Sequence, residues 1–240
     1  MIKLVQKLEG IGWKACKRKL SQFQGPMVLR VGDERVEIGR PKEWETVLPK
    51  NFKLLRSDRL PRSVSRFFRA RRFDPDICEE FDLGYCQPPG EYADCLIAPV
   101  YLRGEVVSFQ ALNPNKGYYE SCAKGRAKYS NKEFLYGVDW VKDSDRVFVV
   151  EGITDVWRLG KGNAVGTFGI KYTRTQVSLL WEFFRGKKLR ILYDADAGEQ
   201  AEALGVELGI LGFENLKIIK LKEGDPADLD ERGVREILRC

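Results

Sequence analysis

The 240-residue sequence contains no histidine, and no two of its six cysteines form a CxxC pair. Without histidine, the chain has no histidine-ligated zinc, no histidine general base and no Ser-His-Asp catalysis. Cysteines scattered singly in a chain of this size are typical of reduced cytosolic thiols, not of a disulfide framework. No apolar run is long enough to span a bilayer, and the N-terminus lacks the apolar middle of a signal peptide. We therefore expect a cytoplasmic protein with no membrane partner.

Negative charge is scarce in the N-terminal third. Residues 1–75 hold 19 Lys and Arg against 8 Asp and Glu, whereas residues 76–240 hold 22 against 27. This imbalance favours polyanion binding by the first part of the chain and a need for carboxylates in the second. A solvated basic surface explains the charge excess about equally well.

Residues 1–60 form a small basic module of undetermined role. Its run PMVLRVGDERVEIGR alternates apolar and polar residues on both sides of Gly32-Asp33, which predicts a hairpin. Residues 61–140 form a second part, an α+β subdomain that begins with two helical pieces broken at Asp74-Pro75.

Two further features of this second part follow from local patterns. The run CLIAPVYLRGEVVSFQAL predicts a hairpin that turns at Arg103-Gly104. The glycine- and lysine-rich passage after it, residues 113–132, has no clear periodicity and predicts a surface loop.

Residues 141–240 form a third part, in which apolar strands alternate with helices. The strand segments are RVFVV, NAVGTFG, LRILY and NLKIIKL, and the helical segments between them are TDVWRLG, TRTQVSLLWEFF and EQAEALGVELGILG. This alternation predicts an α/β fold with a mostly parallel sheet and flanking helices. Ligands of such sheets bind beyond the carboxyl ends of the strands.

Acidic residues follow the ends of three of these strands. Glu151 follows the first, and the last two are followed by Asp194 with Asp196 and by Asp225 with Asp228. On one sheet edge these carboxylates would repel each other without a counter-charge, which Mg²⁺ supplies in proteins through carboxylate oxygens, water and phosphate. For Asp194 with Asp196 alone, a helix cap is the favoured explanation, and Glu151-Gly152 alone is a common turn. The ordered set of three favours a metal site for phosphoryl chemistry.

The same segments resemble a known family. EGITDVWRL, AVGTFG, ILYDADAGEQAE and GDPADL resemble the Toprim fold, a carboxylate metal module shared by primases, topoisomerases and some nucleases. Upstream, FFRARRFDPDICEEFDLGYC, LIAPVYLRGEVVSFQAL and KYSNKEFLYG resemble the core of the bacterial and phage DnaG-type DNA primases. The resemblance covers roughly residues 60–230, and its specificity comes from the order and spacing of the motifs.

The resemblance implies a DNA primase, a DNA-directed RNA polymerase and nucleotidyltransferase of the primosome. Its expected partners are single-stranded DNA template, ribonucleoside triphosphates and a separate replicative helicase. Glu151, Asp194 and Asp196 would be catalytic and hold Mg²⁺, or Mn²⁺ in its place, with Asp225 and Asp228 nearby and Asp155 in support.

The resemblance also implies a set of nucleic-acid or nucleotide contacts. Arg71, Lys128 and Asn131 match positions where the family grips template, nucleotide or primer, and Lys132 stands in for a second family lysine. Basic residues expected to follow the template backbone are Arg72, Lys124 and Arg126. Arg72 occupies a position where the family usually has glycine.

The N-terminus departs from the family. DnaG-type primases begin with a Cys/His zinc ribbon, but residues 1–60 have one cysteine and no histidine, so we expect no zinc. The basic hairpin is a metal-free substitute for it or unrelated packing, and we favour the substitute. No P-loop motif is present, so we expect no fused helicase.

A replication protein so reduced would suit a virus or plasmid, and a viral one would act in the host cytoplasm. The alternatives are a Toprim nuclease or nicking enzyme, which transfers to water, and a non-catalytic DNA-binding replication subunit. A topoisomerase would need more chain than is present.

Overall fold

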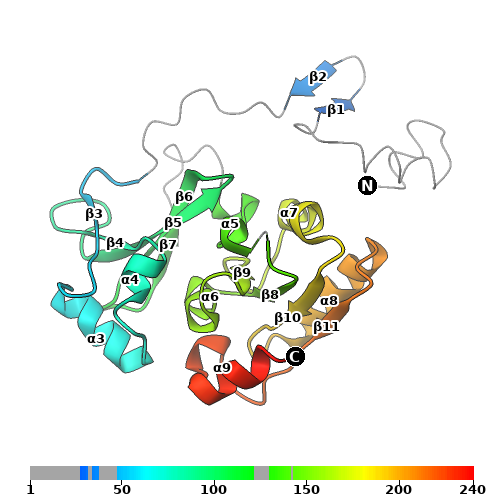
Figure 1. Cartoon of the computed structure of the whole chain (residues 1–240). Coiled ribbons are helices and arrows are strands. Elements are labelled where there is room, and N and C mark those ends of the chain that lie inside the picture. Colours follow the sequence, from blue (N-terminus) through cyan, green and yellow to red (C-terminus); the bar gives the residue numbers. More distant parts are fainter. Residues whose placement is uncertain (1–27, 32–33, 38–47, 122–129, 142) are drawn as a thin grey trace. The chain divides into compact units, whose positions relative to one another are not determined.

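The structure is a computed structural model that describes residues 28–31, 34–37, 48–121, 130–141 and 143–240 (Figure 1). The chain divides into two compact units, Met1–Glu43 and Trp44–Cys240. In the first unit, β1 (Val28–Val31) pairs antiparallel with β2 (Glu34–Glu37), which confirms the predicted hairpin. The division of the chain at residues 60 and 140 stays a prediction. No helix in the described ranges combines the length and apolar character needed to cross a membrane.

The second unit contains an antiparallel sheet of five strands in the order β3-β4-β5-β6-β7. Their bounds are β3 Phe52–Leu54, β4 Gly84–Cys86, β5 Cys95–Leu102, β6 Glu105–Leu112 and β7 Tyr119–Ser121. β5 and β6 form the predicted hairpin, because Arg103 and Gly104 have φ of 56° and 81°, as a type I′ turn requires. The Asp139 carboxylate accepts hydrogen bonds of 2.8 and 2.7 Å from the two N–H groups of that turn. β7 lies in the passage predicted to be a loop, so that prediction was wrong for these three residues.

Two helices connect β3 to β4 on either side of the predicted break at Asp74-Pro75. They are α3 (Arg62–Arg71) and α4 (Ile77–Glu80). α3 ends at Arg72, which adopts a left-handed conformation with φ 55°. Many helices end with a left-handed residue directly after the last helical residue. Glycine is the usual residue there, because it has no Cβ that would clash with the backbone.

The second sheet is parallel, with four strands in the order β11-β10-β8-β9 (Figure 1). Their bounds are β8 Arg146–Val150, β9 Ala164–Gly166, β10 Lys188–Ile191 and β11 Leu216–Ile218. Helices α6 (Ile153–Leu159), α7 (Arg174–Phe184) and α8 (Gly198–Ile210) alternate with these strands. The predicted α/β class with a parallel sheet and flanking helices is therefore confirmed, together with the α+β character of the preceding part.

Alternate residues of β8 enter two different cores, as the period of a strand requires. Val147 and Val149 pack with apolar residues of α7 and α8. Phe148 and Val150 pack with α6 and with α3, whose Phe68 belongs to the same cluster. The parallel sheet is thus buried on both faces, which explains why its strands are continuous apolar runs. The second of these cores is shared with the antiparallel sheet.

The other elements in the described part of the second unit are short. They are α5 (Val138–Val141), α9 (Glu231–Ile237) and the 3-10 helices η1 (Asn131–Glu133) and η2 (Pro226–Asp228). η2 matters for the site, because it carries the last acidic pair of the sequence motif.

Candidate active site

The carboxyl ends of β8 and β10 lie side by side, because these strands are neighbours in the parallel sheet. Glu151 Oε1 accepts a hydrogen bond of 3.1 Å from the backbone N–H of Asp194. The loop before η2 reaches the same edge, where the N–H of Ala195 donates to the carbonyl oxygen of Gly224 at 3.0 Å. The structure thus brings the three acidic motifs together, while the role of each residue stays a prediction.

Asp155 is a buried carboxylate that links the Glu151-Gly152 segment to the Asp225–Asp228 segment. It is only 4% exposed. Its Oδ2 accepts a hydrogen bond of 2.7 Å from the N–H of Gly152, and its Oδ1 accepts one of 3.2 Å from the N–H of Ala227. Burial nevertheless raises its pKa to about 8. Asp155 therefore fixes the geometry of the site, and both of its oxygens are already used.

Asp194 is crowded by other carboxylates. Burial and the nearby charges of Glu151 and Asp225 raise its pKa to about 7. Burial also raises the pKa of Glu151, although the hydrogen bond from Asp194 N–H opposes this rise. Within the described part of the chain, Asp194 Oδ1 is buried without a hydrogen-bond partner. Such an oxygen is costly unless another group, such as a cation, satisfies it.

The carboxylates Glu151, Asp194 and Asp196 have the chemistry that a hard divalent cation requires, but their oxygens do not yet surround a common point. Among the described residues, no three Asp, Glu or Cys side chains are placed so that they could hold a metal ion as they stand. The crowded carboxylates and the unpartnered Asp194 Oδ1 are nevertheless what such a cation would satisfy. Asp196, which is exposed, completes the set in sequence.

The crowding predicts an unusual pH dependence of stability. When folding raises the pKa of a carboxyl group, the protonated group favours the folded state. This contribution is fully present below the ordinary pKa of 3.8. It is lost as the pH rises through the pKa values in the folded protein, about 7 for Asp194 and about 8 for Asp155. We expect the melting temperature of the metal-free protein to fall between pH 5 and 8.5. Each kcal/mol lost corresponds to about 2–4 °C in a domain of this size.

Differential scanning fluorimetry in EDTA across this pH range measures the effect. Excess Mg²⁺ should reduce the fall, because a ligand that binds only the folded state stabilises it. A melting temperature that is flat or rises with pH in EDTA would show that the carboxylates are not crowded in solution.

Arg71 supplies a counter-charge to the acidic pair around η2. Its Nη2 lies 3.3 Å from both carboxylate oxygens of Asp225, and its Nη1 lies 3.4 Å from Asp228 Oδ1. Burial lowers the pKa of the Arg71 guanidinium, but the two carboxylates outweigh burial and raise it. Arg71 comes from the last turn of α3, so the helical segment between β3 and β4 contributes a charge to the carboxylate site.

The other predicted binding residues differ in how they are placed. Arg72 donates a hydrogen bond of 3.2 Å to the carbonyl oxygen of Asp228, and Lys132 Nζ donates to the carbonyl oxygens of Thr167 and Lys171 at 3.2 and 2.7 Å. Asn131 is only 2% exposed, and its amide bonds inside the fold to Phe109 and Ser108. The structure thus places Arg72 at the site and Asn131 in the interior. Lys124, Arg126 and Lys128 lie outside the described residues.

Two residues that sequence reasoning did not select also lie at the site. The hydroxyl of Tyr119 is 3.3 Å from Thr154 Oγ1, and Arg158 donates to the carbonyl oxygen of Ala227 at 2.9 Å. Tyr119 belongs to the passage predicted to be a loop. Arg158 stands out in the sequence only as a basic residue within EGITDVWRL. Neither position carries a local signal of its distant partners.

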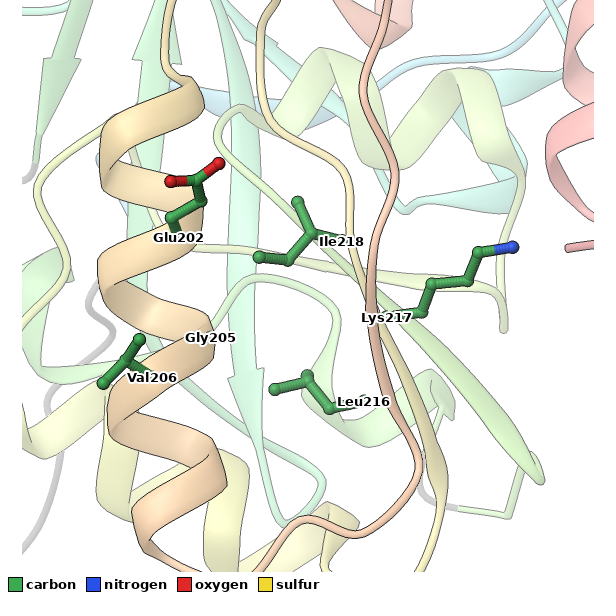
Figure 2. Close-up of a pocket in the computed structure, with 6 residues that line it drawn as sticks. All are labelled: Glu202, Gly205, Val206, Leu216, Lys217 and Ile218. Carbon is green, nitrogen blue, oxygen red and sulfur yellow. The ribbon is translucent and has the colours of Figure 1, made fainter.

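A separate groove lies between α8 and β11 (Figure 2). Its volume is about 580 Å³. Gly205 allows the close approach of the two elements, since a Cβ there would lie 2.9 Å from Ile218 Cδ1. None of the predicted site residues lines this groove, which is lined by Glu202, Gly205, Val206, Leu216, Lys217 and Ile218.

No protein-family model matches the sequence, and no curated protein matches it. Solved structures do match. The zinc-binding and RNA polymerase domains of the Aquifex aeolicus primase align with a TM-score of 0.60 and 22% identity over 99% of this chain and 68% of that one. A DnaG primase catalytic domain bound to single-stranded DNA aligns with a TM-score of 0.62 and 20% identity over 76% of this chain and 72% of that one.

The RNA polymerase domain of Mycobacterium tuberculosis DnaG aligns with a TM-score of 0.58 and 21% identity over 74% of each chain. These proteins are distant in sequence but share one architecture. The chain therefore has the fold of the catalytic core of DnaG-type primases.

Proposed function

We propose that this chain is a primase that makes short RNA primers on single-stranded DNA from ribonucleoside triphosphates. The observation that supports this proposal most is the convergence of Glu151, Asp194 and the η2 loop at one sheet edge, with Arg71 reaching in from α3. The fold shared with DnaG catalytic cores supports the same reaction class. The parallel-sheet part would be the Toprim module of such an enzyme.

In this proposal Glu151, Asp194 and Asp196 hold Mg²⁺ or Mn²⁺. The metal, when bound, would lower the pKa of the primer 3′-hydroxyl and offset the charge on the reacting phosphate and the departing pyrophosphate. The backbone N–H of Asp194 keeps Glu151 oriented, and Asp155 holds the loops of Gly152 and Ala227 at a fixed spacing. Arg71 carries the positive charge nearest to the η2 carboxylates and would bind phosphate oxygens of nucleotide or template.

The direct test is synthesis. Purified protein is incubated with mixed-sequence single-stranded DNA, labelled ribonucleotides and Mg²⁺, and the products are resolved on a denaturing gel. We expect short RNA products that are absent without template. Cleavage of the DNA without RNA synthesis would indicate a nuclease, and DNA binding without either product would indicate a non-catalytic subunit.

We also expect affinity for single-stranded DNA to fall steeply with salt. Binding by the basic N-terminal third releases counterions from the DNA, so the logarithm of affinity falls with the logarithm of salt concentration by about 0.7 for each phosphate contacted. Fluorescence anisotropy with a labelled oligonucleotide between 50 and about 300 mM KCl measures the slope. A slope near zero would contradict polyanion binding by the chain.

A further inference from the structure

Arg158 is a half-buried arginine in the last turn of α6, the helix that begins directly after Glu151 and Gly152. Its guanidinium donates hydrogen bonds to three backbone carbonyl oxygens in two other segments. Nε donates to Ala227 at 2.9 Å, Nη1 donates to Arg72 at 3.0 Å, and Nη2 donates to Arg71. One side chain thus connects α6, the end of α3 and η2.

The carbonyl groups of Arg71 and of the cap residue Arg72 lie at the end of α3, where the last carbonyl groups of a helix have no partner within the helix. The end of a helix also carries partial negative charge, which favours a cation beside it. Arg158 supplies both the donors and the cation from another segment. Its guanidinium further stacks on Phe73, with 4.4 Å from Cζ to the ring centroid.

The guanidinium of Arg158 lies close to two other positively charged side chains. Burial lowers the pKa of Arg158, and so do the neighbouring charges of Arg72 and Arg71. Three arginines are therefore gathered at one place where their charges oppose each other. The geometry outweighs this repulsion because each of the three guanidinium nitrogens donates to a carbonyl oxygen, an arrangement that a compact ammonium group could not match.

The arrangement has a consequence for Arg71. Its backbone carbonyl is bonded to Arg158, while its guanidinium contacts Asp225 and Asp228 on either side of Ala227, whose carbonyl is also bonded to Arg158. The same fork therefore fixes both the arginine and the loop that carries its carboxylate partners.

We propose that Arg158 is a positioning residue, which holds the Arg71 guanidinium in register with the η2 carboxylates and hence with the reacting phosphates. Its kinetic consequence rests on the proposed primase function, whereas the placement of Arg71 does not. Arg158 would act through Arg71, because each of its three guanidinium nitrogens already donates a hydrogen bond to a backbone carbonyl group.

Lysine is the informative replacement, because Arg158→Lys keeps the charge and most of the alkyl chain but loses the planar fork. Arg158→Gln removes the charge as well and is the second variant. Arg235→Lys is the matched control. Arg235 lines the same cleft of about 280 Å³ as Arg158, but its guanidinium pairs with the exposed Glu231 at 3.4 Å.

The first measurement needs no substrate. The side-chain Nε–H signal of Arg71 in the ¹⁵N-labelled full chain is assigned by its loss in Arg71→Lys. We expect this signal to shift and broaden in both Arg158 variants and to stay unchanged in Arg235→Lys. An Arg71 signal that is unchanged in both Arg158 variants would overturn the proposal, whatever the chain catalyses.

The second measurement is a double-mutant cycle in primer synthesis. Arg158→Lys should lower kcat/KM for ribonucleotide by about 10–100-fold, the cost of a displacement near 1 Å at a reacting centre. The loss should largely disappear in an Arg71→Lys background, because a positioning residue has no effect once its target is gone. Additive losses would overturn the proposal. A wild-type chain that makes no primers would refute the proposed function and leave the NMR result to decide the placement of Arg71.

Discussion

Asp194→Asn and Asp196→Asn are each expected to lower primer synthesis by about 10³-fold or more, because a bound metal supplies several kcal/mol of charge stabilisation and each 1.36 kcal/mol is a factor of ten. Asparagine keeps the size of the side chain but removes the charge that a hard cation needs. The fold should survive, since burial and neighbouring carboxylates already oppose ionisation of Asp194. The melting temperature in EDTA should stay equal or rise.

Glu199→Gln is the matched control for these variants. Glu199 is an exposed carboxylate in the first turn of α8, three residues beyond Asp196. It should retain near-normal synthesis, and all three variants should bind single-stranded DNA like the wild type. Near-normal synthesis by Asp194→Asn or Asp196→Asn would contradict the metal assignment.

Arg71→Gln is expected to change two properties in opposite directions. Loss of the guanidinium should lower kcat/KM for ribonucleotide by about 100-fold. The reason is that the phosphate group bound by Arg71 would lose its charged partner. Loss of the same guanidinium removes a cation that lies 3.3 Å from Asp225. Affinity for Mg²⁺ should therefore rise by about 3–10-fold, since a positive charge close to the metal site is removed.

Isothermal titration with Mg²⁺ and with Mn²⁺ measures the second effect, and Arg69→Gln is its control. Arg69 lies in the same last turn of α3, but its side chain is exposed. Weaker metal binding by Arg71→Gln than by Arg69→Gln would show that Arg71 is a structural support of the metal site and not a competing counter-ion.

Much of the parallel sheet follows from local sequence. The apolar runs of β8 and β10 end at Glu151 and just before Asp194, and parallel neighbours must end at the same edge. The hairpin of β5 and β6 follows from Arg103-Gly104, because a two-residue turn needs positive φ at both positions. These features depend on residues that are adjacent in the chain.

The contacts that organise the site depend on residues far apart in the chain. Arg71 meets Asp225 across 154 positions, and Arg158 meets the carbonyl group of Arg71 across 87. Nothing in the period or the composition of α3 or α6 indicates these pairings. β7 was missed for a related reason, because its three residues are exposed and its pairing with β6 provides no apolar alternation to read.

Arg72 follows α3 in a left-handed conformation, which is uncommon for a residue other than glycine. Glycine is usual at a helix end of this kind, because the residue there has a positive φ, which is 55° for Arg72. Arginine there accepts a conformational cost of about 1 kcal/mol, and its side chain gains a hydrogen bond to the Asp228 carbonyl group.

If the chain is a primase, the sequence of the DNA template must dictate which RNA is made. The protein is incubated with Mg²⁺ and labelled ATP on poly(dT) and on poly(dA), with Asp194→Asn in parallel. We expect short RNA on poly(dT) only with ATP, on poly(dA) only with UTP, and no product from Asp194→Asn. RNA made equally on both templates, or no RNA together with cleaved DNA, would contradict the proposed primase function.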